Sequence, residues 1–185
     1  MSMVVSPEVT TTTWNIDPAH SAAHFKVRHM MISNVKGEFT HLSGKLELDG
    51  TDITKSHVEA LIDAATINTR DAERDAHVKS SDFLYVEKFP ILSFKSTQVS
   101  KRGDVGLAVE GELTIRGVTR QVVFDVEGPS APVKDPWGNT RVGLSAMTHI
   151  NRKDFGLIWN SALETGAVLV GDDVAITLDV EFVAS

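Results

Sequence analysis

The 185-residue chain contains no cysteine, and no stretch approaches the ~20 apolar residues of a membrane span. Without cysteine it has no disulfide framework, no thiolate nucleophile and no zinc–thiolate site. Residues 1–13 also lack the basic region and the apolar stretch, about 7–15 residues long, of a secretory signal. We therefore predict a cytoplasmic protein without a transmembrane segment, periplasmic or secreted only if a leader has been removed.

Acidic residues outnumber basic ones, 25 to 18, and the formal net charge at pH 7 is -7. Proteins that follow a phosphate backbone normally carry a basic face, so we predict no nucleic-acid partner. The length and the 42% hydrophobic content are sufficient for one domain with a sizeable core. We predict a flexible N-terminal tail over residues 1–11 and a single domain over residues 12–184.

Motifs of catalysis and nucleotide binding are missing from the sequence. It has no G-x-S-x-G elbow, no phosphate loop and no dinucleotide fingerprint. Seven histidines invite a metal hypothesis, but His20 and His24 lie in or beside a predicted strand, where positions four apart are ~13 Å apart. No H-E-x-x-H motif and no acidic–histidine cluster has the spacing of metal ligands. We therefore predict no metal site, no required cofactor and no enzymatic activity.

Most of the chain alternates between apolar and polar residues, which is the period of a half-buried strand. In residues 20–29, for example, Phe25 and Val27 share one face, and His24 lies on the other. We count about eight such strands, joined mostly by short turns. This pattern predicts an all-β fold, either an antiparallel sandwich or an up-and-down barrel, and the meander-like turns favour the barrel.

One stretch, near residues 69–80, predicts a helix that caps the barrel. Asn68 or Thr69 is a suitable N-cap, because a short side-chain oxygen accepts a hydrogen bond from a first-turn N–H group. The stretch is too polar to gain much from burying an apolar face, so the helix should dock through specific polar contacts. The residues expected to make these contacts are Arg74, Asp75 and His77.

The inward apolar positions of the strands have two explanations. Small residues such as Ala60 and Ala146 alternate with large ones such as Phe94 and Phe124. Small and large side chains can interdigitate into a solid core, or they can leave a lumen that holds one small ligand. Periodicity alone leaves both explanations open.

Six motifs occur in order along the chain, and together they resemble the YceI-like family of bacterial lipocalin-like, polyisoprenoid-binding proteins. The motifs are Trp14-x-Ile16-Asp17-x-x-His20-Ser21-x-x-x-Phe25-x-Val27-x-His29, Gly37-x-Phe39-x-x-x-x-Gly44, Thr66-Ile67-x-Thr69-x-x-x-x-Arg74-Asp75-x-His77-Val78-x-Ser80-x-Asp82-Phe83, Phe89-Pro90-x-x-x-Phe94-x-Ser96, Gly111-x-Leu113-Thr114-Ile115-x-Gly117-Val118-Thr119 and Asn151-Arg152-x-Asp154-Phe155-Gly156. The resemblance implies an extended, lipocalin-like antiparallel barrel. It also implies a homodimer and a long apolar ligand in the lumen, such as a polyisoprenoid, an isoprenoid quinone or a similar lipid.

The alternation places candidate ligand-binding residues on the inward faces of the strands. Met147 is out of phase with Ala146, so at most one of the two lines the lumen unless a bulge intervenes. The predicted lumen residues are Phe25, Val27, Phe39, Ile62, Phe94, Leu113, Phe124, Ala146 and Met147, with Phe155 and Trp159 at a rim; the candidates for contact with a polar head group are His29, Arg74 and His77.

Two alternatives to a lipid-binding protein remain. The first is an enzyme that acts on an apolar substrate and uses His29, Asp75 or His77, although Asp75 and His77, two apart on a helix, do not face each other. The second is a stress-related dimeric module with a filled core and no ligand. A lumen inside the barrel argues against this second alternative.

Overall fold

The computed structural model describes residues 11–185. The predicted tail lies outside these residues except for Thr11, which begins the first strand. The strands are β1 Thr11–Ile16, β2 Ala22–His29, β3 Ser33–Phe39, β4 Leu42–Asp49, β5 His57–Asp63, β6 Ile67–Asn68, β7 Ile91–Arg102, β8 Gly106–Ile115, β9 Val118–Glu127, β10 Val133–Lys134, β11 Thr140–Asn151 and β12 Val170–Ala184. The helices are α1 Ala72–Lys79 and four 3-10 turns, η1 Pro18–His20, η2 Ile53–Lys55, η3 Ala64–Thr66 and η4 Arg152–Phe155. No helix within residues 11–185 is long and apolar enough to cross a bilayer.

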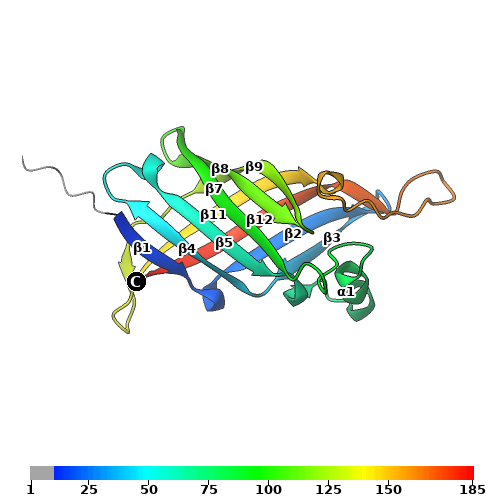
Figure 1. The fold of residues 1–185 in the computed structure, drawn as a ribbon, viewed down its shortest axis with the longest axis horizontal. Helices are drawn as coiled ribbons and strands as arrows, with labels where there is room; N and C mark the ends of the chain where they lie inside the picture. The colour runs from blue at the N-terminus through cyan, green and yellow to red at the C-terminus, as the bar shows by residue number, and fades with distance from the viewer. Residues whose placement is uncertain (1–10) are drawn as a thin grey trace, which may run out of the picture.

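Eight of the strands close into one antiparallel barrel, as Figure 1 shows. The order around the barrel is β11, β9, β8, β7, β5, β4, β1 and β12, and the pairing of β12 with β11 completes the ring. β12 also pairs with β2, which continues through β3 to β6 and extends the wall at one end. The predicted all-β, lipocalin-like barrel is confirmed, and the count of about eight strands matches the ring.

The strands form because their alternating sequences give each one an apolar face that must leave water. In β9, Phe124 and Val126 are buried inside the barrel, whereas Val123, which precedes Phe124, is exposed. Ala146 of β11 pairs with Val126 of β9 on one side and with Leu178 of β12 on the other. The same alternation continues around the ring, so the inner face is apolar in every long strand.

The helix α1 lies where the sequence predicts a helix, but it is shorter than expected and begins at a different cap. The N-cap is Asp71, whose carboxylate accepts a hydrogen bond from the Arg74 N–H group at 2.9 Å. Asn68 belongs to β6 instead, and its side chain accepts a hydrogen bond from the Arg70 N–H group. The prediction of Asn68 or Thr69 as the cap is therefore wrong, because tertiary pairing of β6 with β3 holds this segment extended.

The two ends of the barrel differ in how they are built. At one end lie the start of β1, the C-terminus and the β7–β8 turn (Figure 1). At the other end lie α1, the β2–β3 turn and the segment between η4 and β12 (Figure 1). The second end is therefore formed largely by non-strand segments, and it carries most of the polar residues considered below.

Candidate functional site

A cavity of about 390 Å³ lies inside the barrel, and its walls are almost wholly apolar. It extends from Ile53 and Leu107 near the β7–β8 end to His29 and Val170 near the α1 end. The inward faces of the strands supply most of the wall. Segment 69–84 completes it at the α1 end, where Thr69, Val78, Phe83 and Leu84 line the cavity. The helix is thus part of the container and not only a cap outside it.

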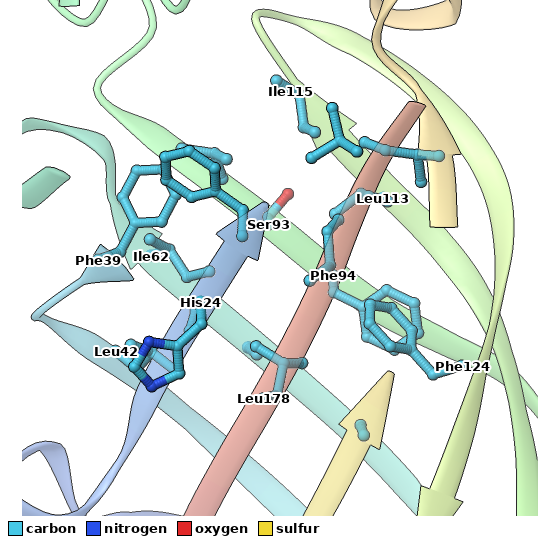
Figure 2. Close-up of a pocket in the computed structure, with 18 of the residues that line it drawn as sticks. His24, Phe39, Leu42, Ile62, Ser93, Phe94, Leu113, Ile115, Phe124 and Leu178 are labelled. Carbon is cyan, nitrogen blue, oxygen red and sulfur yellow. The ribbon is translucent and has the colours of Figure 1, made fainter. Parts of the chain in front are cut away.

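Most of the residues that the sequence places in the lumen do line this cavity. Figure 2 shows the side chains of Phe39, Ile62, Phe94, Leu113 and Phe124 around it. The rings of Phe94 and Phe124 meet edge to face, with their centroids 5.0 Å apart. The predicted residues that line the cavity are Phe25, Val27, Phe39, Ile62, Phe94, Leu113, Phe124, Ala146 and Trp159. That they bind a ligand stays a prediction.

Two of the predicted positions are wrong. The Met147 side chain is 55% exposed on the outside of β11, because its neighbour Ala146 takes the inward position and no bulge shifts the phase there. Phe155 is only 1% exposed and packs in the core beneath the η4 turn, without reaching the cavity wall. The 3-10 turn η4, which follows β11, directs this ring into the core together with Leu157. The sequence predicts a position at the rim instead.

Two phenylalanine rings in the wall each lie against a glycine of a neighbouring strand. A Cβ atom added to Gly37 of β3 would stand 2.3 Å from Cζ of Phe25 on β2, so the ring occupies the space of a missing side chain. A Cβ atom on Gly111 of β8 would likewise stand 2.6 Å from Cζ of Phe94. A larger residue at Gly37 would displace the Phe25 ring, and one at Gly111 would collide with the Phe94 ring and with the Lys95 carbonyl. The glycines therefore help to set the width of the cavity.

One group of polar wall residues lies at the α1 end, around the buried side chain of Thr69, while Ser56 and His57 lie at the end near Ile53. The Thr69 hydroxyl donates to Oδ1 of Asp75 at 2.5 Å, and its N–H group donates to the same oxygen at 2.8 Å. Arg74 donates from Nε to the Thr69 hydroxyl and from Nη2 to the Thr69 carbonyl, at 2.9 and 2.6 Å. These contacts fix α1 against the wall, in agreement with the expected polar docking.

His77 belongs to a small aromatic cluster that joins α1 to the segment between η4 and β12. Its ring centroid lies 4.6 Å from that of Trp159 and 5.1 Å from that of Phe83, both in edge-to-face contact. The rings of Phe83 and Trp159 also contact each other, with their centroids 5.3 Å apart. Nε2 of His77 lies 2.8 Å from a carboxylate oxygen of Asp82. The structure thus brings His77 and Trp159 together, and both line the cavity with His29 and Arg74.

Arg152 is a cavity-lining residue that the sequence analysis did not single out, although it stands in the sixth motif. Its side chain is 3% exposed. The guanidinium donates to the carbonyls of Leu157, Trp159 and Gly171, at 2.9 Å to Trp159 and 2.8 Å to Gly171. Burial lowers the pKa of this guanidinium, and the charge of Asp172, 3.6 Å away, opposes that shift. Arg152 therefore ties the segment after η4 to the start of β12.

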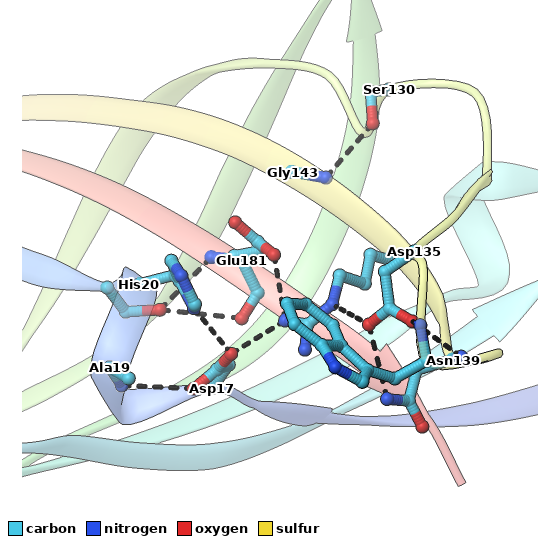
Figure 3. A network of polar contacts seen from close by, with 11 residues as sticks. Asp17, Ala19, His20, Ser130, Asp135, Asn139, Gly143 and Glu181 are labelled. Atoms are coloured by element: carbon cyan, nitrogen blue, oxygen red, sulfur yellow. Dashed lines mark hydrogen bonds and ion pairs between the residues drawn. The ribbon is translucent and has the colours of Figure 1, made fainter.

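A second arginine, Arg141, binds three carboxylates near the start of β11, and Figure 3 shows these carboxylates, of Asp17, Asp135 and Glu181, close together. Nη1 of Arg141 lies 2.6 Å from Asp17 and 2.8 Å from Glu181, and its Nε lies 2.7 Å from Asp135. Hydrogen bonds from Arg141, and then from His20, hold the pKa of Asp17 at about 2. Arg141 likewise holds the pKa of Asp135 at about 2. We call these four residues the Arg141 clamp.

The arrangement of Asp17, His20 and Glu181 also resembles a set of metal ligands, because their ligand atoms lie within 4.8 Å of one another. The guanidinium of Arg141, however, already bridges the two carboxylates with its positive charge. This group therefore ties β1, β11 and β12 together through ion pairs.

Comparison with known proteins identifies the family to which this chain belongs. The model of the YceI-like domain matches residues 14–182. A UPF0312 protein of Staphylococcus aureus, SA2479, is 35% identical over 171 residues, which cover 92% of this chain and 97% of that protein. A Campylobacter jejuni YCEI protein is 28% identical in sequence. Its crystal structure superposes with a TM-score of 0.71, over 86% of this chain and 91% of that one.

The fold is also that of a polyisoprenoid binding domain from Saccharophagus degradans. That structure superposes with a TM-score of 0.65, over 94% of this chain and 99% of the other, at 16% identity. At this identity the likeness concerns the fold.

Proposed function

The chain belongs to the YceI-like domain family, and from this premise we propose that it binds a long apolar chain inside the barrel. The proposed ligand is a polyisoprenoid, an isoprenoid quinone or a similar lipid. The observation that carries the proposal is the cavity of about 390 Å³, which runs along the barrel behind apolar walls and has several polar residues at the α1 end. A relative in fold is described as a polyisoprenoid binding domain, which supports the same class of ligand.

Binding of such a ligand needs no catalytic group. Burial of apolar surface contributes about 25 cal/mol per Å², so a chain that loses a few hundred Å² of exposure gains several kcal/mol before association costs. Selectivity would then follow from the length and width of the cavity. The rings of Phe25 and Phe94, which rest against Gly37 and Gly111, set that width on two sides.

The polar residues at the α1 end are suited to contact a head group, in keeping with the prediction for His29, Arg74 and His77. Arg74 is bound to Thr69 only through neutral oxygens, and no carboxylate of residues 11–185 lies within ion-pair distance of it. A head group with a hydrogen-bond acceptor would give this guanidinium a further partner.

The alternatives receive less support from the geometry. A ligand-free module with a filled core requires side chains to meet in the middle of the barrel, where the cavity lies. An enzyme that uses Asp75 or His77 requires these groups to reach a substrate, whereas Asp75 is bound by Thr69 and His77 is paired with Asp82. The homodimer and the cytoplasmic location stay predictions; light scattering of the purified protein tests the first.

The proposal is tested by extracting the purified protein with organic solvent and by native mass spectrometry of the intact protein. We expect a long-chain apolar molecule to be recovered from the wild type. Phe94→Arg puts a charge in the lumen and should abolish retention of this molecule. Val123→Arg puts the same side chain on the outer face of β9, so it is the matched control and should retain the ligand. Equal retention by both variants would contradict the proposal.

A further inference from the structure

Five exposed aliphatic side chains gather on two neighbouring segments at the α1 end of the barrel. On the β2–β3 turn, Ile32 is 75% exposed, and Met30 and Met31 are also exposed. On the segment between η4 and β12, Ile158 and Val168 are exposed. The N–H group of Met30 donates to the Leu169 carbonyl at 2.8 Å, which holds the two segments side by side. We call these five residues, Met30, Met31, Ile32, Ile158 and Val168, the apolar tip.

The backbone of the β2–β3 turn is held in an unfavourable conformation that presents these side chains. Met30 and Met31 both have positive φ angles, 52° and 60°. Turn positions with positive φ normally carry asparagine, aspartate or glycine, because other side chains are strained there. The two methionines and the isoleucine found here have no intrinsic preference for such a turn, and their side chains are not buried. Their exposure therefore calls for a partner that covers them.

The apolar tip adjoins the wall of the cavity along the chain. Each of its segments adjoins a residue of the cavity wall: His29 precedes Met30, Trp159 follows Ile158, and Leu169 follows Val168. An apolar chain that leaves the cavity between these segments meets the tip first. It then needs a second apolar phase, because exposure of its length to water costs the free energy that binding had gained.

The shape and charge of this end match a lipid surface. The segment around residues 161–169 forms a small hairpin that projects beyond the barrel (Figure 1), with Ala162 bridged to Val168. Projecting apolar points suit insertion among acyl chains. Arg28 donates to the Met31 carbonyl at 3.0 Å and has no carboxylate within ion-pair distance among residues 11–185. Glu164 lies on the projecting hairpin, so both signs of charge flank the tip.

We propose that the apolar tip docks this end of the barrel on a lipid bilayer. Docking places the α1 end of the cavity at the membrane surface, so that an apolar chain passes between bilayer and lumen without crossing water. The docking step is independent of the ligand, whereas the transfer step rests on the proposed function.

Flotation with vesicles of phosphatidylcholine and phosphatidylethanolamine tests the docking. We expect the full-length protein to float with the vesicles, with little dependence on salt because apolar contacts dominate. Ile32→Glu and Ile158→Glu, one on each segment, should each lower the bound fraction roughly tenfold. Val105→Glu alters an 86% exposed aliphatic residue on the β7–β8 turn, at the other end of the barrel, and should bind as the wild type does. All three positions are exposed, so circular dichroism should show unchanged folding.

A second measurement reports which end meets the lipid. Tryptophan introduced as Met31→Trp should be quenched by brominated phosphatidylcholine beyond the wild-type baseline, and Val105→Trp should not be. Absence of flotation, or equal losses in all three glutamate variants, would overturn the proposal. So would light scattering that shows Ile32→Glu converting a dimer to a monomer, because the tip would then bind a second copy of the chain. If the tip docks but solvent extraction recovers no apolar molecule, docking stands and the proposed function fails.

Discussion

Arg141 and Arg152 lie eleven positions apart, at the start and just past the end of β11, and they hold opposite ends of the barrel by different means. Arg141 is 20% exposed and binds three carboxylates on the outer surface. Arg152 is 3% exposed and binds mainly backbone carbonyls beside the cavity. The pKa of Arg141 is raised by its carboxylates, and that of Arg152 is lowered by burial.

This difference follows from what each end must do. The Arg141 clamp joins strands that are already paired, β1 with β12 and β12 with β11, so its ion pairs add to an existing ladder. The segment between η4 and β12 has few backbone ladder bonds of its own, apart from the Ala162–Val168 bridge. The buried guanidinium attaches it, together with the Asn160 side chain, which is bonded to Val170. We expect the barrel to depend more on Arg152 than on Arg141.

The largest effect is expected from Arg152→Met. The substitution leaves the carbonyls of Leu157, Trp159 and Gly171 without their donor and should lower the free energy of unfolding by roughly 3 kcal/mol, measured by urea denaturation. Lys153→Met removes a half-exposed cation next to it and is the control, with an expected change below about 0.5 kcal/mol. Equal effects of the two substitutions would show that the buried contacts do not hold this end.

A smaller effect on stability, but a large one on binding, is expected from Gly37→Ala. The new methyl group collides with the Phe25 ring, which must turn into the lumen, so retention of the apolar ligand should fall while stability drops by about 1–2 kcal/mol. The readout is the amount of apolar molecule recovered by solvent extraction.

A companion substitution and a control make this test specific. Phe25→Leu in the Gly37→Ala background frees space and should restore part of the retention. Gly143→Ala is the matched control, because a Cβ atom there meets only an ordinary contact at 3.7 Å. If Gly143→Ala also loses the ligand, the loss in Gly37→Ala does not come from a narrower cavity.

The smallest effect on stability is expected from Arg141→Gln, and it should be present at neutral pH and fade in acid. The pKa of Asp17 is lowered from 3.8 to about 2, so its contribution to stability is complete above 3.8 and is lost as the pH falls toward 2. Asp135 behaves in the same way. Urea denaturation between pH 5 and pH 2 should show a steep fall in wild-type stability.

The fall should be shallower in Arg141→Gln, because the two carboxyl groups then titrate nearer their ordinary values in the folded protein. Arg120→Gln, an exposed arginine outside the clamp, should keep the wild-type profile. Identical profiles for all three proteins would mean that the Arg141 clamp does not stabilise this end.

The strand faces are predictable from sequence because a period of two assigns every side chain to one side. Phe25, Phe94 and Phe124 were placed correctly by this rule alone. Met147 is wrong because the same alternation assigns the inward position to Ala146, and no bulge intervenes to bring both residues to the lumen.

The α1 end was less predictable because its contacts depend on residues distant in sequence. Phe155 turns inward through a 3-10 helix, which periodicity does not detect. Several residues before α1 are able to cap it, and the choice of Asp71 depends on the pairing of β6 with β3. The carbonyl partners of Arg152 extend to Gly171, nineteen positions away, so its only sequence signal is its place in the sixth motif.

The most direct test of an apolar lumen is a crystal structure of the protein purified without added lipid. We predict continuous, elongated density inside the barrel, in contact with Phe94 and Phe124 and ending near His29 and Trp159. Side chains that meet across the barrel and fill the present cavity of about 390 Å³ would contradict the account, as would a chain of ordered water along it.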